Sequence, residues 1–340
     1  MTSSHGRGLL HLAAAVDRRS AHDADAPVEL TRLAERGALD FVTLGEGSAG
    51  PGPGTLDAGG PDAPGAAGTS RDALAVLARA APVTSRIGLV PTVAAGRTDP
   101  FRVPAGVVAL DRASHGRAGW QWRAAGGSAE GFPGVPAARQ GPPARLRKRR
   151  ADDPPQGHPV RVVDATDPHT RIAAGRHADV VLVRAGSLAQ AVTARTELRD
   201  AARESGRDAG CLRVLAALTV DLGDGEYAAE SGWGTPRFGH VRDLGGAGSG
   251  ARRGGDGPLY RGGPVDLAEL IAAWHETGAV DGFHLTPVEP RRDLERLVNG
   301  TVALLQHRGR FRTFYPGSTL REHLGLSRPT TRYTVTGGAS

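Results

Sequence analysis

The chain has 340 residues, of which 39% are hydrophobic and 23% are charged, and its formal net charge is +6. Its single cysteine, Cys211, excludes an internal disulfide and a cysteine-based zinc site, and we interpret it as a small buried residue. No apolar run approaches the roughly 18 residues that a membrane-spanning helix needs, so we expect a cytoplasmic globular protein without a membrane partner.

Eight short apolar runs rich in β-branched residues alternate with segments of helical spacing. This alternation is typical of a parallel sheet wrapped by helices, and eight strands are the number that closes a barrel. In chain order, the predicted strands are Leu9 to Val16, Asp40 to Leu44, Arg86 to Val93, Arg117 to Arg123, Pro159 to Ala165, Asp179 to Arg184, Leu212 to Leu222 and Asp281 to Thr286. The sequence therefore predicts an α/β fold, a (β/α)8 TIM barrel over residues 1–326, followed by a tail over 327–340.

The helical segments between these runs carry start and stop signals, since Pro favours a first turn and Gly or Pro follows a last turn. Their apolar residues recur on one face, as in helices that cover a sheet. The predicted helices are Pro27 to Arg36, Ser70 to Ala81, Pro100 to Ser114, one opened by Asp167 and Pro168, Ser187 to about Gly206, one opened by Asp266 and one opened by Pro290.

Two long stretches rich in Gly and Pro, residues 124–157 and 224–264, interrupt this pattern. Irregular loops of this length are uncommon in compact domains, so each is interpreted either as a mobile lid or as a partly deleted region. The first contains a basic run from Arg145 to Arg150 without interleaved aromatic residues. We interpret this run as a solvated loop in preference to a nucleic-acid site.

Several short strings share a family pattern. Gly116-Arg117-Ala118-Gly119-Trp120 opens the fourth predicted strand, and further strings match in order and spacing. These are Asp40-Phe41-Val42 before Gly45-Glu46, Thr84-Ser85-Arg86-Ile87-Gly88-Leu89 before Thr92, Asp281-Gly282-Phe283-His284-Leu285, and a tail from Leu304 to Leu326. Outside the two irregular stretches, the chain resembles the bacterial luciferase-like flavin monooxygenases, particularly the branch of nitrilotriacetate and sulfone monooxygenases.

The resemblance implies a barrel that binds reduced FMN supplied by a separate flavin reductase and uses O2 to oxidise a small organic substrate. A deazaflavin cofactor is a further alternative within the same resemblance. The site is expected at the carboxyl ends of the strands, where the loops of a barrel converge. No glycine-rich dinucleotide fingerprint is present in the sequence, which favours a mononucleotide flavin over tightly bound NAD.

Three predicted cofactor-binding residues follow the second, third and fourth strands. By the resemblance, Glu46 lies near the flavin ring, although an exposed loop carboxylate is an equal alternative. Thr92 offers a hydroxyl to a flavin carbonyl or serves the strand alone. Gln121 stands where the family often has Asn, so its amide reaches one methylene further. Of its neighbours Trp120 and Trp122, at least one is expected to pack in the core.

The turn after the fifth strand carries two more cofactor-binding candidates, Thr166 and Asp167. By the resemblance, this turn has a Gly-Ser-Ser-Pro-like sequence whose N–H groups and hydroxyls hold the flavin phosphate at a helix start. Here the turn reads Ala165-Thr166-Asp167-Pro168, with Thr170 where Gly is expected. Asp167 suits a helix cap, and its carboxylate would repel a phosphate.

His11, in the first strand, is the catalytic candidate, as an acid or base at the barrel mouth, with a core histidine as the alternative. His284 in the last strand has the same two interpretations. After the sixth strand, Arg184 and Ser187 are candidates for a phosphate clamp, although Ser187 fits a helix cap better. The histidine spacing indicates no metal site.

Two function classes therefore remain open. The intact strand order and tail favour the monooxygenase. The departures at Asp167 and Thr170 favour a catalytically degenerate barrel that acts as a partner subunit or binding protein, because a fold alone does not carry activity. By the resemblance, either is expected to form homo- or hetero-oligomers.

Overall fold

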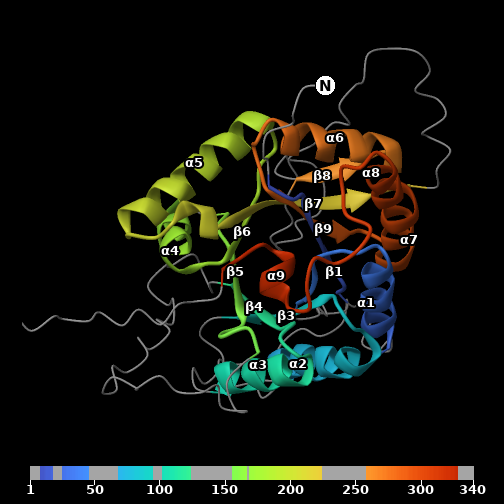
Figure 1. Cartoon of the computed structure of the whole chain (residues 1–340). Helices are drawn as coiled ribbons and strands as arrows, with labels where there is room; N and C mark the ends of the chain where they lie inside the picture. Colours follow the sequence, from blue (N-terminus) through green and yellow to red (C-terminus); the bar gives the residue numbers. More distant parts are fainter. Residues whose placement is uncertain are drawn as a thin grey trace, which may run out of the picture.

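The computed structural model describes residues 8–17, 25–45, 68–94, 102–123, 155–166, 168–223 and 258–327. Within these residues, parallel strands pair in the order β6-β5-β4-β3-β2-β1-β9-β7, and β7 pairs back to β6, which closes a barrel of eight strands (Figure 1). These strands are β1 His11–Ala15, β2 Phe41–Leu44, β3 Gly88–Ala94, β4 Gly119–Arg123, β5 Val160–Asp164, β6 Val180–Val183, β7 Arg213–Asp221 and β9 Gly282–Pro287. The predicted TIM barrel is confirmed.

One strand was not expected from the sequence. The short strand β8, Leu259–Arg261, pairs in parallel with the last three residues of β7 and lies within the stretch predicted to be irregular over 224–264. Its register runs from Thr219 opposite Leu259 to Asp221 opposite Arg261, so it prolongs the sheet beside β7 without being one of the eight barrel strands. The irregular prediction was wrong for these residues, while 124–154 and 224–257 lie outside the described residues.

Helices surround the barrel at the predicted places, and one short helix near residue 320 was not expected from the sequence. They are α1 Ala26–Arg36, α2 Gly68–Ala80, α3 Arg102–Ala113, α4 Pro168–His177, α5 Leu188–Glu204, α6 Pro264–Glu276, α7 Pro290–Arg296, α8 Ala303–His307 and α9 Leu320–His323, with short 3-10 turns at Ala81–Val83 and Ala209–Cys211 and a π-helical turn at Leu297–Val302. Ser187 caps α5 by accepting a hydrogen bond from the Gln190 N–H, as expected. Helix α6 begins at Pro264, two residues before the predicted Asp266.

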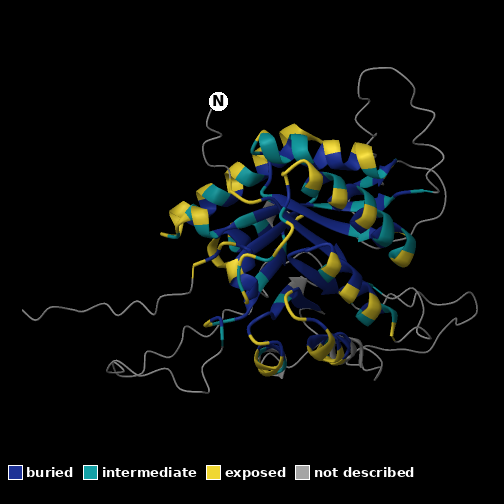
Figure 2. Ribbon diagram, turned by 45° about the vertical axis from the view of Figure 1, so that its right-hand side comes forward, coloured by how far each residue is buried: buried dark blue, intermediate teal, exposed yellow. Residues whose placement is uncertain are grey.

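The core has two layers, because most residues on both faces of the barrel strands are buried (Figure 2). The larger layer packs between the strands and the outer helices. The inner layer fills the barrel itself and contains Ala13, Phe41, Val90, Val162, Val180, Leu182 and Leu215. Alternate residues of each strand therefore face the barrel interior, which decides where later polar residues point.

The segment after α8 closes the amino end of the barrel. Leu320, Leu324 and Leu326 belong to the inner core, and α9 lies over the middle of the barrel in Figure 1. The strands leave room for this packing, since a Cβ added at Gly88 would lie 2.6 Å from Leu320 Cδ1. We call residues 311–326 the floor segment.

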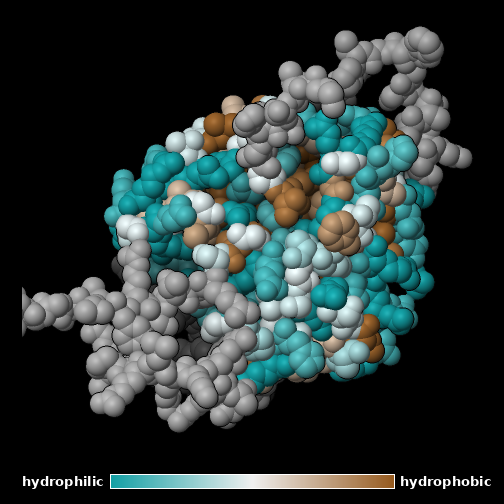
Figure 3. Space-filling view, viewed as in Figure 1, coloured by the Kyte–Doolittle hydropathy of each residue, from teal (hydrophilic) through white to brown (hydrophobic). Residues whose placement is uncertain are grey.

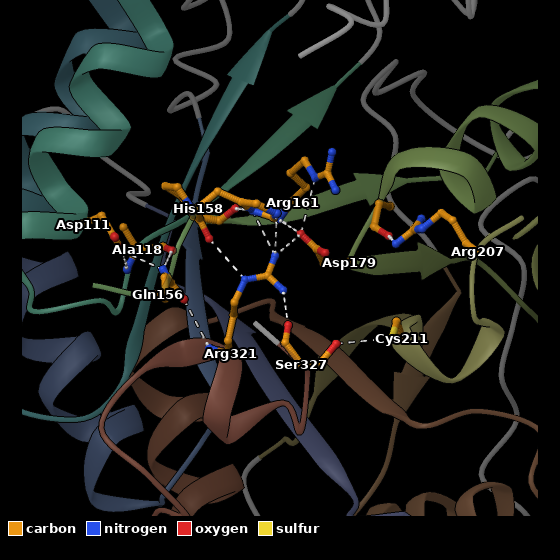
Figure 4. A network of polar contacts seen from close by, with 12 residues as sticks. Asp111, Ala118, Gln156, His158, Arg161, Asp179, Arg207, Cys211, Arg321 and Ser327 are labelled. Atoms are coloured by element: carbon orange, nitrogen blue, oxygen red, sulfur yellow. Dashed lines mark hydrogen bonds and ion pairs between the residues drawn. The ribbon is translucent and has the colours of Figure 1, made fainter. Parts of the chain in front are cut away.

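Arg321 attaches the floor segment to β5 and β6 (Figure 4). Its guanidinium pairs with Asp179 at 3.0 Å and donates to the His158 and Ser327 carbonyls. Its backbone N–H donates to Gln156, whose amide donates in turn to Asp111 and to the Ala118 carbonyl. Both Arg321 and Asp179 are almost fully buried.

Arg312 attaches the other end of the floor segment. It pairs with Asp40 at 2.9 Å and donates to the Ala38 carbonyl, and Asp40 also contacts His11 Nδ1 at 3.1 Å. Asp40 is fully buried, which by itself raises its pKa, but the opposing charges of Arg312 and His11 and their hydrogen bonds bring the pKa down to about 2. Buried ion pairs thus hold the floor segment at both ends.

Two further observations concern sequence predictions. Cys211 is only partly buried, at the end of the 3-10 turn before β7, with Sγ 3.6 Å from Ser327 Oγ. The expectation of a buried cysteine was wrong, because the turn capped by Asp208 places it outside the core. Over the part of the chain that is described, no helix is long and apolar enough to cross a membrane.

Candidate active site

The carboxyl ends of the barrel strands carry polar side chains on their inward-facing positions. Thr43 and Thr92 stand two residues after the inner-core residues Phe41 and Val90, and Asp164 and Arg184 stand two residues after Val162 and Leu182. Gln121 pairs in register with Thr92. The upper barrel interior is therefore polar, in contrast to the apolar layer beneath it.

Thr92 and Gln121, both predicted to bind the cofactor, form a hydrogen-bonded pair. The Thr92 hydroxyl donates to Gln121 Oε1 at 3.1 Å, and both residues are buried. This contact fixes the orientation of the Gln121 amide, so that its NH2 group points away from Thr92. Among the described residues, none accepts a hydrogen bond from Gln121 Nε2, so two donors are available to a ligand.

A second polar pair joins β2 to β9. Thr43 Oγ1 lies 2.8 Å from His284 Nε2, and both side chains are buried. The His284 ring also stacks on Phe41, with centroids 6.4 Å apart. The imidazole is therefore held by a hydroxyl and an aromatic ring at inward-facing positions, on the side of the barrel away from Gln121 in strand order.

The turn after β5 is occupied by a carboxylate of its own chain. Asp164 accepts hydrogen bonds from the Thr166 N–H at 3.2 Å and from the Thr166 hydroxyl, and it pairs with Arg184 at 3.1 Å. The Thr166 donors and the Arg184 cation are the groups that were predicted to hold a phosphate. In this structure the Asp164 carboxylate holds all three.

The remaining predicted residues divide into three groups. Glu46 and Asp167 lie outside the described residues. Thr170 is buried in the first turn of α4, and its hydroxyl is therefore not presented to solvent. Trp120 packs with the outer core, which agrees with a structural role for one of the two tryptophans.

His11 lies at the amino end of the barrel, away from Thr92, Gln121 and the turn after β5, and two residues before the level of His284. It is the first residue of β1, is 2% exposed, and contacts the buried Asp40. Thr92 lies in the carboxyl half of β3 and Gln121 at the middle of β4, so the structure does not bring His11 to them. The strand was predicted to begin at Leu9, and its actual start at His11 places this residue at the amino end.

Two further candidate residues were missed from the sequence, Thr43 and Asp164. Both follow an inner-core residue at a spacing of two, so counting alternate positions along β2 and β5 finds them once the inner face is known. Over the described residues, no cluster of three His, Cys, Asp or Glu side chains is arranged to hold a metal ion.

The chemistry available at this end is hydrogen bonding and orientation. An amide with two available donors, a hydroxyl–imidazole pair and a carboxylate–guanidinium pair line the barrel interior. Such a set suits a planar ligand with carbonyl groups, held at one edge by Gln121.

Comparison with known proteins gives a consistent result. The sequence model of the family described as luciferase-like monooxygenase matches residues 8–148. The chain is 27% identical to nitrilotriacetate monooxygenase component A of Aminobacter aminovorans, over 91% of each chain. It is 24% identical to the N-acetyl-S-(2-succino)cysteine monooxygenase of Bacillus subtilis (strain 168), over 90% of each chain.

A solved structure shares the fold. The EDTA monooxygenase from Chelativorans sp. BNC1 superposes with a TM-score of 0.67 at 19% identity, covering 94% of this chain and 99% of that one. At this identity, the likeness concerns the barrel architecture.

Proposed function

We propose that this chain is a luciferase-like monooxygenase that uses reduced FMN and O2 to oxidise a small organic substrate. The observation that carries the proposal is the Thr92–Gln121 pair, which presents an ordered amide at the carboxyl end of the barrel. Active sites of TIM barrels lie at this end.

The residues at the ring side fit a flavin. The isoalloxazine ring has carbonyl groups along one edge, and Gln121 Nε2 offers two donors while Thr92 fixes its orientation. When bound, the reduced flavin supplies the oxygen chemistry, and the protein supplies binding, orientation and exclusion of water. Thr43 and His284 give the opposite wall a polar contact for a substrate.

The phosphate side fits only after a local change. Asp164 occupies the Thr166 N–H, the Thr166 hydroxyl and Arg184, so a phosphate must displace its carboxylate from these donors. Arg184 is partly exposed and pairs with Asp164 beside this turn, and Arg171, which pairs with Glu197, donates to the Ala165 carbonyl. We therefore expect weaker FMN binding than an unoccupied turn would give.

The relatives suggest the partners. One of them is component A of nitrilotriacetate monooxygenase, which supports a separate flavin reductase as the partner of this chain too. Reduced flavin must reach the barrel before it reacts with O2, so the reductase and this chain are expected in the same compartment. We propose that this compartment is the cytoplasm. A homo- or hetero-oligomer and a single barrel domain over residues 1–326 remain part of the proposal.

A second candidate function is a catalytically degenerate barrel that acts as a partner subunit or binding protein. The Asp164 contacts favour it, because a carboxylate stands where a phosphate is expected and the sequence places a second one, Asp167, nearby. This candidate predicts a folded protein without affinity for flavin.

The two candidates separate in a calorimetric titration under anaerobic conditions with reduced FMN, oxidised FMN, riboflavin and a deazaflavin. Tight binding of reduced FMN by the parent chain supports the monooxygenase. If the deazaflavin binds more tightly than reduced FMN, the deazaflavin is the cofactor. Binding by Asp164→Ser or Asp167→Ser but not by the parent supports the degenerate barrel. Asp200→Ser, at an exposed pair on α5, is the matched control and should behave as the parent.

A further inference from the structure

A cavity of about 500 Å³ opens at the amino end of the barrel, between α5, the end of α6 and the end of the floor segment. It is lined by Arg195, Arg199, Arg213, His275, Asp281 and Leu324, among others. Arg213 is the first residue of β7 and Asp281 immediately precedes β9, so the cavity lies at the amino ends of these strands. It is therefore separate from the polar pairs at the carboxyl end. Figure 3 shows this face as mainly hydrophilic, with a small apolar patch between α6 and α9.

Three guanidinium groups and one carboxylate line this cavity. Arg195 pairs with Asp281 and donates to the Gly278 carbonyl, and Arg199 lies 3.9 Å from the same carboxylate. Arg213 donates to the carbonyls of Gly210, Leu324 and Gly325 and pairs with no carboxylate among the described residues. Carbonyl oxygens satisfy its donors but leave its charge uncompensated.

Unused donors accompany this excess charge. The Nε atoms of both Arg195 and Arg199 are buried and have no hydrogen-bond partner. The Arg199 side chain is 33% exposed, and its contact with Asp281 is too long for a hydrogen bond. Burial lowers the pKa of Arg195, and the neighbouring charges of Arg199 and Arg213 lower it further against the opposing effect of Asp281.

His275 does not add to this excess of positive charge, because burial lowers its pKa and so favours the neutral imidazole. His11 contacts the Asp40 carboxylate at 3.1 Å. Three guanidinium charges and one carboxylate leave two positive charges, which is the complement of one phosphate dianion. Arg presents its donors in a planar fork that matches phosphate oxygens.

We propose that this cavity binds a small phosphate-bearing molecule, held by Arg195, Arg199 and Arg213. The phosphate supplies acceptors for the Arg199 guanidinium and compensates Arg213. Because the cavity touches α5, α6 and the floor segment, a bound phosphate joins these elements and stabilises the amino end of the barrel. The proposal does not depend on the flavin site.

Isothermal titration of the full chain with inorganic phosphate and with pyrophosphate, at constant ionic strength set with chloride, tests this. We expect saturable binding and a rise in Tm with ligand. In Arg199→Gln the Kd should rise at least tenfold and the Tm shift should shrink, whereas Arg199→Lys should largely keep both. Arg203→Gln, on the same helix with an exposed Asp200 partner, is the matched control and should bind as the parent.

Two results would overturn the proposal. One is the absence of saturable binding of either anion by the folded parent chain. The other is binding that persists in Arg199→Gln and is lost in Arg184→Gln, which would place the anion at the turn beside Asp164. Circular dichroism of each variant shows whether the fold is kept, and the partial exposure of Arg199 makes a folded variant the expected result.

Discussion

The ordered amide of Gln121 depends on one hydroxyl. Thr92 holds Oε1 and thereby presents Nε2, so the pair behaves as a unit in spite of coming from two strands. The resemblance pointed to both residues, but their mutual contact follows from the register of β3 and β4, which one sequence does not specify.

Replacing Gln121 tests this unit. Gln121→Leu removes the donors and leaves the buried Thr92 hydroxyl without its acceptor, so we expect reduced FMN to bind about 5- to 100-fold more weakly. Gln121→Asn keeps the amide that the family often has and should stay within a few-fold of the parent. Calorimetric Kd values check this, with Gln190→Leu, at an exposed position in the first turn of α5, as control. Equal Kd values for all three variants would remove Gln121 from the site.

A buried histidine in the floor segment predicts a pH dependence. Burial lowers the pKa of His323 from 6.5 to about 4, and its Nδ1 has no hydrogen-bond partner. Between these two pH values the unfolded chain binds a proton that the folded chain does not, so the free energy of unfolding falls as pH drops from 6.5 to 4, by about 3 kcal/mol.

The variant His323→Gln isolates this effect, since its amide can still donate to the Gly317 carbonyl as Nε2 does. Urea unfolding at pH 7, 5.5 and 4 should show a shallower loss of stability in the variant than in the parent. Parallel curves would mean that His323 does not carry the dependence.

At the scale of elements, the sequence predicted the repeated strands and helices of the barrel and missed a short strand. All eight barrel strands were found, because each is an apolar run between helical segments. Strand β8 was missed because three residues, Leu259–Arg261, give no measurable alternation. Helix α6 begins two residues before the predicted Asp266, because Pro264 occupies its first turn.

The attachments of the floor segment were beyond sequence reasoning. Arg321 and Asp179 are far apart in the chain, and nothing local indicates that an arginine in a tail helix will be buried against a strand. Likewise, the catalytic prediction for His11 depended on a direction along the barrel axis that only the pairing of β1 and the contact with Asp40 fix.

Removing the Arg321 contact should loosen the amino end of the barrel. Arg321→Met leaves the buried Asp179 carboxylate with fewer partners, and we expect a loss of about 3–5 kcal/mol in the free energy of unfolding. Arg308→Met breaks an exposed pair with Glu269 and should cost less than about 1 kcal/mol. Urea denaturation compares the two, and similar losses would contradict the assigned role.

At the scale of the whole molecule, the two ends of the barrel have different tasks. The carboxyl end carries polar pairs with available donors, and the amino end is filled by leucines and closed by buried ion pairs. Substitutions in the leucine core and buried ion pairs of the amino end should therefore change stability first, and substitutions at the carboxyl end should change flavin binding first.

Acid unfolding should start at the amino end. The folded pKa of Asp40 is about 2 against an ordinary value of 3.8, so its contribution is complete above pH 3.8 and is lost as pH falls towards 2. The difference corresponds to about 2 kcal/mol. Asp40→Asn should be less stable than the parent at pH 6 and lose less on acidification from pH 4 to 2, as measured by thermal unfolding. Equal acid slopes would contradict this.

The floor segment also has a consequence for biosynthesis. Residues 311–326 follow every barrel strand in the sequence, yet they supply three leucines of the inner core. At about 5–20 residues per second, the eight strands emerge from the ribosome before the residues that close them underneath. The amino end of a nascent barrel therefore exposes apolar side chains until residues 311–326 have been synthesised. A chaperone would be needed most during this interval.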